Sequence, residues 1–237
     1  MGFSKPRNFD SPYYPFEKPN AFTTLKGAEL IPYKLLTYLL DLPDKYGYVP
    51  KDDNSRPRVR LAKYLWYDEA NPLAQPLPTP EQKLSMLYNG ENAALTTEED
   101  KKNHPKGYRL LAQTYSEPSE TDAQVLLKCY MAREIPRSDL KIVIGLNFEV
   151  VVNYALDNIM RTLVYSRSYA IHQCLVEALH GVDLAGIGTI HYSKPVHGDC
   201  GSPSPYHSEG QQIYRSAFFA IDWQESTTPQ GVVASWN

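Results

Sequence analysis

Three histidines and one cysteine gather within segment 191–207, where they could bind a metal. They are His191, His197, Cys200 and His207. Imidazole and thiolate are ligands that zinc prefers, and a structural zinc site uses four of them. The spacing H-x5-H-x2-C-x6-H is that of neither a zinc finger nor a zinc ribbon, and a second cysteine is missing from the segment. We therefore predict no metal site and interpret this segment as a polar surface loop, with zinc binding or partner contact as the alternatives.

A thiol nucleophile is the second chemistry that this sequence offers. Cys200 follows Asp199 and has histidines near it, but catalysis needs a thiolate, a base and an orienting group in contact. A chain with six histidines and three cysteines offers such a pairing by chance. Cys174 falls on an apolar helical stripe and is expected in the core. The acidic run 98–100 stands beside lysines and is typical of a solvated face.

No motif for nucleotide, hydrolase or zinc-protease chemistry is present. The chain lacks a phosphate-binding glycine loop, a GxSxG elbow and an HExxH pair. We predict that it has no catalytic residue and no cofactor, and that it is not an enzyme.

A small basic cluster precedes and enters segment 58–67, which alternates loosely and predicts a strand. Its members are Arg56, Arg58, Arg60 and Lys63. On a strand, Arg58 and Arg60 would share one face, from which the cluster could contact DNA or an acidic partner. The alternative is ordinary exposed charge. The net charge of −3 argues against a dedicated nucleic-acid-binding protein.

The second half of the chain carries the clearest structural patterns. Segment 141–150 alternates strictly and predicts a strand with Ile142 and Phe148 on one face. We predict one long helix over 157–180, capped by Asp157, with Arg167 on a polar face. Further strands are predicted over 122–131, which ends before Pro136, over 186–196 and over 211–225. In the last strand, the inward side chains are either Tyr214, Phe218 and Ala220 or Arg215, Phe219, Ile221 and Trp223, and the apolar character of the second set near the C-terminal end favours it.

The first half is rich in proline and tyrosine, which favours extended segments that lie on other surfaces. Residues 1–23 predict an extended arm with the aromatic anchors Tyr13, Tyr14 and Phe16, and a disordered terminus is the alternative. A helix is predicted over 27–42. Residues 68–120 predict a long irregular insertion that contains one short helix, 81–88.

These elements predict a single α+β domain over residues 1–237. An antiparallel sheet would pack on the one long helix, with the extended arm and the irregular insertion added to it. The start of the chain has no apolar stretch after its charges, and no window approaches the ~18 apolar residues of a membrane helix. We therefore expect synthesis in the cytoplasm and no membrane partner.

The order of these elements resembles the tail-terminator family of long-tailed bacteriophages. The first helix is GAELIPYKLLTYLLDL, and the central hairpin is DAQVLLKCYM with DLKIVIGLNFEVVV. The packed helix follows as DNIMRTLVYSRSYAIHQCLVEALHG, and the closing strands are IGTIHYSKPV and QIYRSAFFAIDW. The resemblance covers the order and pattern of the elements. The arm and the insertion 68–120 exceed the compact pattern of the family.

The resemblance implies a virion protein of the tail–neck region, made in the host cytoplasm. Copies of the chain would form a ring, expected to be a hexamer, that caps the tail tube and joins it to the head-side connector. Its partners would be the tail tube, the sheath protein, a connector or stopper protein, and DNA in transit through the lumen. The central hairpin would contact neighbours through Arg133 and Arg137, and the arm through its aromatic anchors.

Three other readings remain open at the level of sequence, one of which is a cellular binding module. The chain could be another phage neck or tail protein, such as a stopper, a tube protein or a decoration protein. It could also be a zinc- or thiol-dependent enzyme that uses the loop 191–210. Bound zinc would favour the enzyme, and a fixed ring stoichiometry would favour a structural protein.

Overall fold

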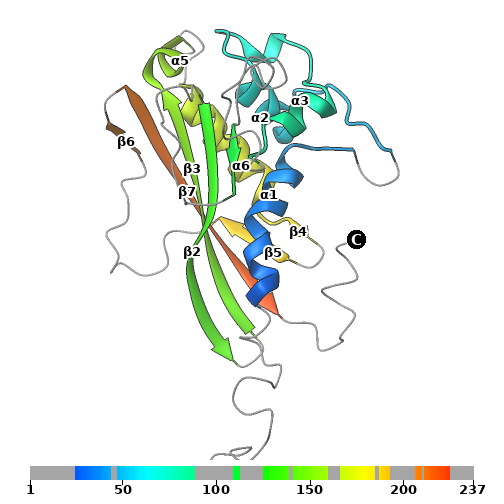
Figure 1. The fold of residues 1–237 in the computed structure, drawn as a ribbon, viewed down its shortest axis with the longest axis vertical. Helices are drawn as coiled ribbons and strands as arrows, with labels where there is room; N and C mark the ends of the chain where they lie inside the picture. The colour runs from blue at the N-terminus through cyan, green and yellow to red at the C-terminus, as the bar shows by residue number, and fades with distance from the viewer. Residues whose placement is uncertain are drawn as a thin grey trace, which may run out of the picture.

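The computed structural model describes residues 25–43, 47–88, 109–112, 125–138, 141–159, 166–184, 187–192, 206–209 and 211–224. These residues form an α+β fold of helices and one mixed sheet (Figure 1). The predicted arm, with Tyr13, Tyr14 and Phe16, lies outside the described residues, as do the acidic run 98–100 and most of the predicted insertion.

The helical segments are short, and three of the α-helices have proline in their first turn. They are η1 (Leu25–Leu30), α1 (Ile31–Leu39), α2 (Pro57–Trp66), η2 (Pro72–Ala74), α3 (Pro80–Ser85), α5 (Tyr154–Ile159) and α6 (Arg167–Leu179). Proline costs no hydrogen bond in a first turn, because the N–H groups there have no partner within the helix. The predicted helices over 27–42 and 81–88 are confirmed in type, although α3 ends three residues early.

A capping box explains why α3 forms at this point of a proline-rich stretch. The Thr79 hydroxyl accepts a hydrogen bond from the backbone N–H of Gln82 at 3.3 Å. The side-chain oxygen of Gln82 in turn accepts one from the N–H of Thr79 at 2.9 Å. The predicted insertion contains η2 in addition to the one short helix that was expected there.

The strands build one sheet in the order β1-β2-β3-β7-β5-β4, with β6 also paired to β7. They are β1 (Leu110–Leu111), β2 (Val125–Ser138), β3 (Lys141–Asn153), β4 (Asp183–Leu184), β5 (Gly188–Tyr192), β6 (Tyr206–Glu209) and β7 (Gln212–Gln224). All pairings are antiparallel except that of β1 with β2, which is parallel. The predicted antiparallel sheet is therefore mixed at one edge.

Strand β2 is longer than its sequence pattern indicates. The predicted strand ended before Pro136, but Pro136 pairs with Ile142 inside the β2–β3 hairpin. The prediction of a break was wrong because proline is tolerated on a strand whose other side needs no ladder bond. Register shifts follow Met131 and Pro136, so the strand bends at these two places.

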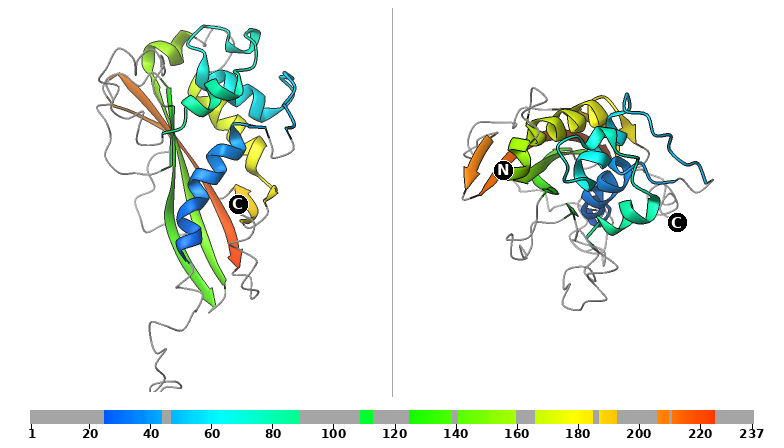
Figure 2. Two further views of the ribbon diagram at one scale, coloured as in Figure 1. Left: turned by 45° about the vertical axis from the view of Figure 1, so that its right-hand side comes forward. Right: turned by 90° about the horizontal axis from the view of Figure 1, so that it is seen from above.

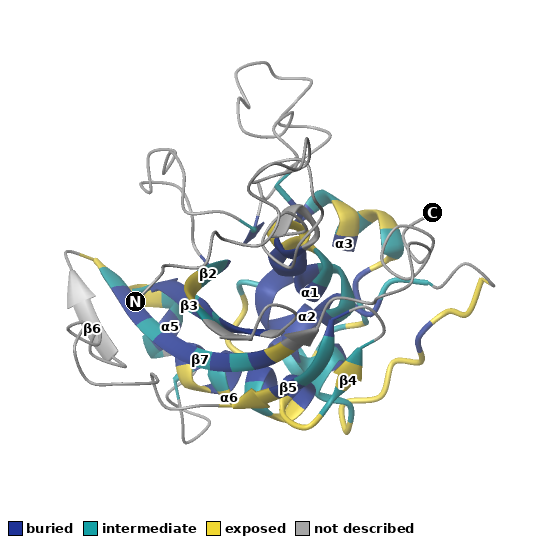
Figure 3. Cartoon of the chain, turned by 90° about the horizontal axis from the view of Figure 1, so that it is seen from below, coloured by how far each residue is buried: buried dark blue, intermediate teal, exposed yellow. Residues whose placement is uncertain are grey.

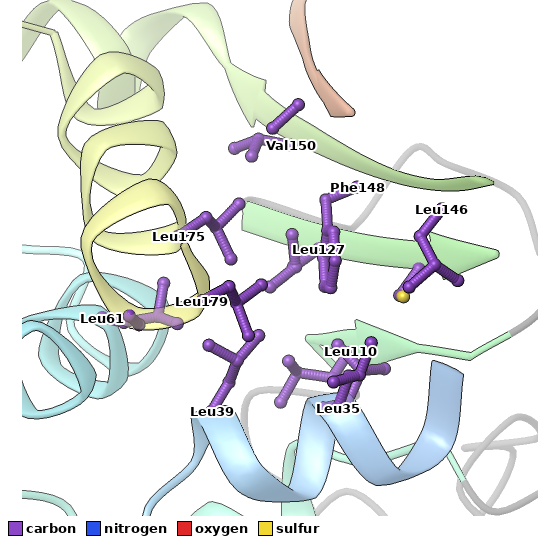
Figure 4. Close-up of a cluster of buried hydrophobic side chains, with 14 of the residues drawn as sticks. Leu35, Leu39, Leu61, Leu110, Leu127, Leu146, Phe148, Val150, Leu175 and Leu179 are labelled. Carbon is purple, nitrogen blue, oxygen red and sulfur yellow. The ribbon is translucent and has the colours of Figure 1, made fainter. Parts of the chain in front are cut away.

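The hydrophobic core lies between one face of the curled sheet and the helices α1, α2 and α6 (Figures 2 and 4). Phe148 and Val150 of β3 point toward Leu175 and Leu179 of α6, and Leu35 of α1 lies below them (Figure 4). The alternating face that was predicted for segment 141–150 is thus confirmed. In β7, Phe219 and Ile221 are buried in the same core, as expected. Arg215 is only partly buried, and the side chain of Trp223 lies outside the described part.

The second face of the sheet is arranged in rows across β2, β3 and β7. One row joins Leu126, Val151 and Tyr214 in a small apolar cluster. The next row joins Lys128, Glu149 and Ser216, and contains a Lys128–Glu149 ion pair at 3.4 Å. The third row joins Tyr130, Asn147 and Phe218, and the Asn147 amide donates to the Tyr130 hydroxyl at 2.6 Å.

The single long helix over 157–180 is replaced by two helices, α5 and α6. Ser166 has an extended backbone and caps α6, because its hydroxyl accepts a hydrogen bond from the N–H of Tyr169. Asp157 still serves the same helix from a distance: its carboxylate accepts from the N–H of Ser168 at 2.7 Å. The sequence pattern found an acidic partner for the start of this helix, but it lies within α5, eleven residues before the N–H group that it accepts from.

Segment 58–67 forms the helix α2, and the predicted strand is wrong. Its side chains are buried on nearly every side, which blurs the helical period that would otherwise have appeared in the sequence. Within the described ranges, no helix is both long and apolar enough to cross a membrane. Figure 3 shows that burial is concentrated along β7, α1 and α2, whereas exposed residues mark the outside of α3 and α6.

Candidate functional site

The closed end of the β2–β3 hairpin is the part of the sheet that reaches farthest from the helices. It extends past the N-terminal end of α1 at the bottom of Figure 1. Ala132, Arg133 and Glu134 are exposed on this end of β2. Arg137 lies in the same strand next to the second register shift, and its side chain is outside the described part. Two arginines predicted as partner contacts are therefore placed together on this projecting element.

The outer edge of β2 carries features that oppose backbone pairing with another strand. In the described residues, β1 pairs only with Leu127 and Lys128 of β2. Beyond them, the edge bends at its register shifts, contains Pro136 and bears charged side chains. Such features block the addition of a foreign strand. A contact at this end would therefore use side chains rather than a shared backbone ladder.

The predicted basic cluster is placed on α2 and is matched by acids of the same chain. Arg56 and Arg58 both contact the carboxylate of Asp41, at 2.7 and 3.0 Å. Arg58 also lies over the ring of Tyr38, 4.4 Å from its centroid. Asp41 has a positive φ of 51°, which brings its buried carboxylate toward the two arginines at the end of α1.

The other two cations of the cluster are also paired. Arg60 forms an ion pair with Glu177 of α6. Lys63 is buried and contacts Asp52 at 2.6 Å and the side-chain oxygen of Asn54 at 2.9 Å. The expected strand face of Arg58 and Arg60 does not exist, because the segment is helical. Contact between the cluster and DNA or an acidic partner stays a prediction, and its charges are largely neutralised within the fold.

A buried lysine joins the same region. The ammonium group of Lys83 in α3 donates to the backbone oxygen of Asp41 at 3.2 Å. Burial lowers the pKa of Lys83, and the Asp41 carboxylate partly opposes this effect. Three cations from α2 and α3 thus converge on the end of α1, where the helix carbonyls and one carboxylate attract positive charge.

The four residues considered for zinc do not form one site. His191 pairs with Ala220 of β7, and His207 pairs with Tyr214 of the same strand. These partners are six residues apart on β7, or about 20 Å, which is too far for both histidines to bind one metal. His197 and Cys200 lie outside the described residues. Among the residues that are described, no three metal-binding side chains gather.

The two described cysteines are buried and unreactive. Cys174 lies on the inner side of α6, as predicted, and its burial raises the pKa of the thiol to about 12. Burial also raises the pKa of Cys129 in β2 well above its ordinary value. A thiol with a raised pKa holds little of the thiolate that acts as a nucleophile.

The fold buries a charged cluster between α2 and α6 that no local sequence pattern indicated. Arg167 is fully buried and donates to the backbone oxygens of Tyr64, Tyr67 and Glu69. Burial lowers the pKa of Arg167, and Asp68 partly opposes this effect. The role of this cluster is structural, because each hydrogen bond joins α6 to the end of α2.

Asp68 links this cluster to the edge of the sheet. Its carboxylate forms an ion pair with the buried Arg109 at 3.3 Å, and Arg109 also donates to the backbone oxygen of Val125. The guanidinium groups of Arg109 and Arg167 thus both contact the segment that follows α2. Charge balance here depends on segments that are far apart in sequence, so no local motif could have revealed it.

A second cluster missed by the sequence lies where α6 meets β5. It contains His172 of α6, His180 directly after that helix, and His191 and Tyr192 of β5. The signal in the sequence was that His180 and His191 flank residues 181–190, between the end of α6 and the end of β5.

No protein-family model matches the chain, and no curated protein matches its sequence.

Proposed function

We propose that this protein is a structural subunit of a bacteriophage virion that assembles with copies of itself into a ring of roughly six. The ring would lie in the tail–neck region, cap the tail tube and join it to the head-side connector. The projecting hairpin end with its exposed Arg133 and Glu134 is the observation that carries the proposal. The resemblance in element order supplies the identity of the assembly.

The form of the hairpin supports contact through side chains. A ring needs two different surfaces on each subunit, one of which fits the other on the next copy. The projecting end provides a narrow charged surface, whereas the bends and proline of β2 limit pairing between strands. We therefore infer that the hairpin inserts against a polar surface of the neighbouring copy without extending its sheet.

A stopper, tube or decoration protein is the second candidate, and the same hairpin supports it. The roles differ in which surface meets the tail tube. Mixing the purified chain with isolated tubes or connectors and sedimenting them would separate these roles, because a terminator binds at the tube end and a decoration protein binds elsewhere.

The first test is the mass and shape of the purified protein. Light scattering on a sizing column, followed by negative-stain microscopy, should show rings of roughly six subunits with a central hole. A monomer at every accessible concentration would contradict self-assembly.

Reversing the charge of one hairpin residue tests the surface itself. We expect Arg133→Glu to shift the rings to smaller species, because like or mismatched charges oppose docking at a contact. Lys51→Glu makes the same charge change at an exposed loop position away from the hairpin and should leave the rings intact. If both variants form the same rings and melt like the unaltered chain, the hairpin takes no part in the contact between copies.

A further inference from the structure

Three histidines surround Tyr192, the last residue of β5. The backbone N–H of Tyr192 donates to Nδ1 of His180 at 3.0 Å. The ring of Tyr192 meets the ring of His172 edge-on, with centroids 6.1 Å apart. The ring of His191 lies 6.4 Å from that of His180. One imidazole therefore holds the backbone of Tyr192, and another packs against its side chain.

The neighbouring bonds between β5 and the end of α6 do not titrate. The N–H of Gly181 donates to the oxygen of Ile190 at 2.8 Å, and the N–H of Ile190 donates to the oxygen of Val182 at 2.9 Å. These two backbone bonds fix the middle of β5. Tyr192, two residues farther along, is tied to α6 through a side chain whose charge depends on pH.

The bond to His180 requires one protonation state of the imidazole. Nδ1 can accept the N–H of Tyr192 only while it carries no proton, so neutral His180 must hold its proton on Nε2. Protonation of Nδ1 would place two donors face to face. The same tautomer also prevents His180 from offering a free ring nitrogen to a metal.

His172 responds to acid in the same direction. Its burial, and secondly the guanidinium of Arg215 in β7, lower the pKa of His172. Arg215 lies over the ring of Tyr169, 5.3 Å from its centroid. A proton on His172 would add a second positive charge to this partly buried place beside Tyr192.

Glu177 and Asp183 are the charged residues that lie nearest to His180 along the chain. Glu177 lies one turn earlier on α6, and its charge is matched by Arg60 of α2. Asp183 of β4 is exposed and pairs in register with Thr189 of β5. His191 is the second titratable ring near His180, and two imidazolium ions at this separation repel each other.

We propose that this joint is an acid-sensitive latch. Neutral His180 and His172 hold the end of β5 against α6, and protonation of both in acid breaks the bond between His180 and the Tyr192 amide. The change stays local, because the backbone bonds at Ile190 persist and Tyr192 remains paired with Phe219 of β7, whose ring packs against its own. The latch is a property of the single chain and does not depend on the proposed assembly.

Amide hydrogen exchange of the full chain, measured by NMR at about pH 7.5 and about pH 5, tests the latch. Protection of the Tyr192 amide is compared with that of Ile190 in the same sample, after correction for the intrinsic effect of pH. The ratio of the two should fall about fivefold to tenfold in acid, as expected from the loss of one hydrogen bond. An unchanged ratio would overturn the proposal.

Two substitutions assign the effect to its residue. In His180→Asn, the side-chain oxygen can accept from the same amide and does not titrate, so the ratio should stay flat. His191→Asn is the matched control, and in this variant the ratio of Tyr192 to Ile190 protection should still fall in acid. A fall that persists in His180→Asn would overturn the role of His180.

A measurement on the unaltered chain covers the case in which the variant does not fold. The ¹⁵N shifts of His180 at neutral pH should show the tautomer with its proton on Nε2. A proton on Nδ1 at neutral pH would exclude the bond that defines the latch.

Discussion

At the scale of single residues, Arg167 shows how a buried charged side chain can join two helices. The sequence pattern placed it on a polar helix face, but it is fully buried. Its guanidinium satisfies three backbone oxygens at and beyond the end of α2, where helix carbonyls lack partners within the helix. A planar group with five donors suits this task, whereas an ammonium group would serve fewer acceptors.

Replacing Arg167 by methionine should lower the free energy of unfolding by about 3–5 kcal/mol, because buried carbonyls and charges lose their partner. Urea denaturation measures the change. Arg167→Lys should recover only part of the loss. Gln173→Ala, at an exposed position of the same helix, should change stability by less than about 0.5 kcal/mol. Equal losses for Arg167→Met and Gln173→Ala would contradict the role of Arg167.

His172 should make the fold less stable in acid. Its pKa is lowered in the folded state, so the unfolded chain binds this proton more readily. The contribution of His172 to the free energy of unfolding is fully present above the pKa of about 6.5 that it has in the unfolded chain. This contribution is lost as the pH falls from there toward the lower pKa of the folded state. Thermal melting between about pH 8 and about pH 5 measures how steeply stability falls with pH. His172→Gln should flatten it, and an unchanged slope would assign the effect to another group.

At the scale of elements, glycines in two strands have opposite roles. A Cβ at Gly145 of β3 would meet only Arg133, at ordinary contact distances of 3.4 Å to its Cβ and 3.5 Å to its backbone oxygen. Gly188 of β5 has a φ of +98°, and a Cβ there would lie 3.1 Å from the backbone oxygen of Asp222. Only the second position requires glycine for its backbone conformation and its close approach to β7.

We expect Gly145→Ala to raise the free energy of unfolding by about 0.5–1 kcal/mol, because alanine loses less backbone entropy on folding. Gly188→Ala should lower it by about 1–3 kcal/mol, because of backbone strain and the close contact. Urea denaturation of the two variants checks both signs. A loss at Gly145 as large as that at Gly188 would mean that the hairpin is packed more tightly than its geometry indicates.

At the scale of the whole molecule, the described core begins in sequence after the predicted N-terminal arm. The described core cluster begins at Ala28 and joins α1, α2 and α6 to the sheet. The aromatic anchors predicted for the arm, Tyr13, Tyr14 and Phe16, precede this cluster in sequence. Their proposed role in contacts between copies is therefore open to a test by truncation.

Deletion of residues 1–23 should weaken assembly and leave the domain folded. Light scattering should show smaller species at a given concentration, because each copy loses its apolar anchors. Calorimetry on the truncated chain should still show one cooperative transition. If cooperative melting disappears on truncation, the arm belongs to the core and its predicted role is wrong.

The sequence alone determined the elements whose signals are local. The strict alternation of β3 identified its buried face, with Phe148 pointing inward, and the apolar stripe of α6 placed Cys174 in the core. Proline in the first turn located α1 and α3. These patterns work because the periods of strand and helix are properties of neighbouring residues.

Tertiary structure decided every feature in which the partner is distant in sequence. The helix α2 was mistaken for a strand, because burial on nearly all sides removes the amphipathic period, and even Lys63 is buried against Asp52 and Asn54. The pairing of Asp41 with Arg56 and the gathering of histidines at Tyr192 depend on the same kind of contact. Ion pairs and hydrogen bonds between segments are set by how elements pack, and no local spacing encodes that packing.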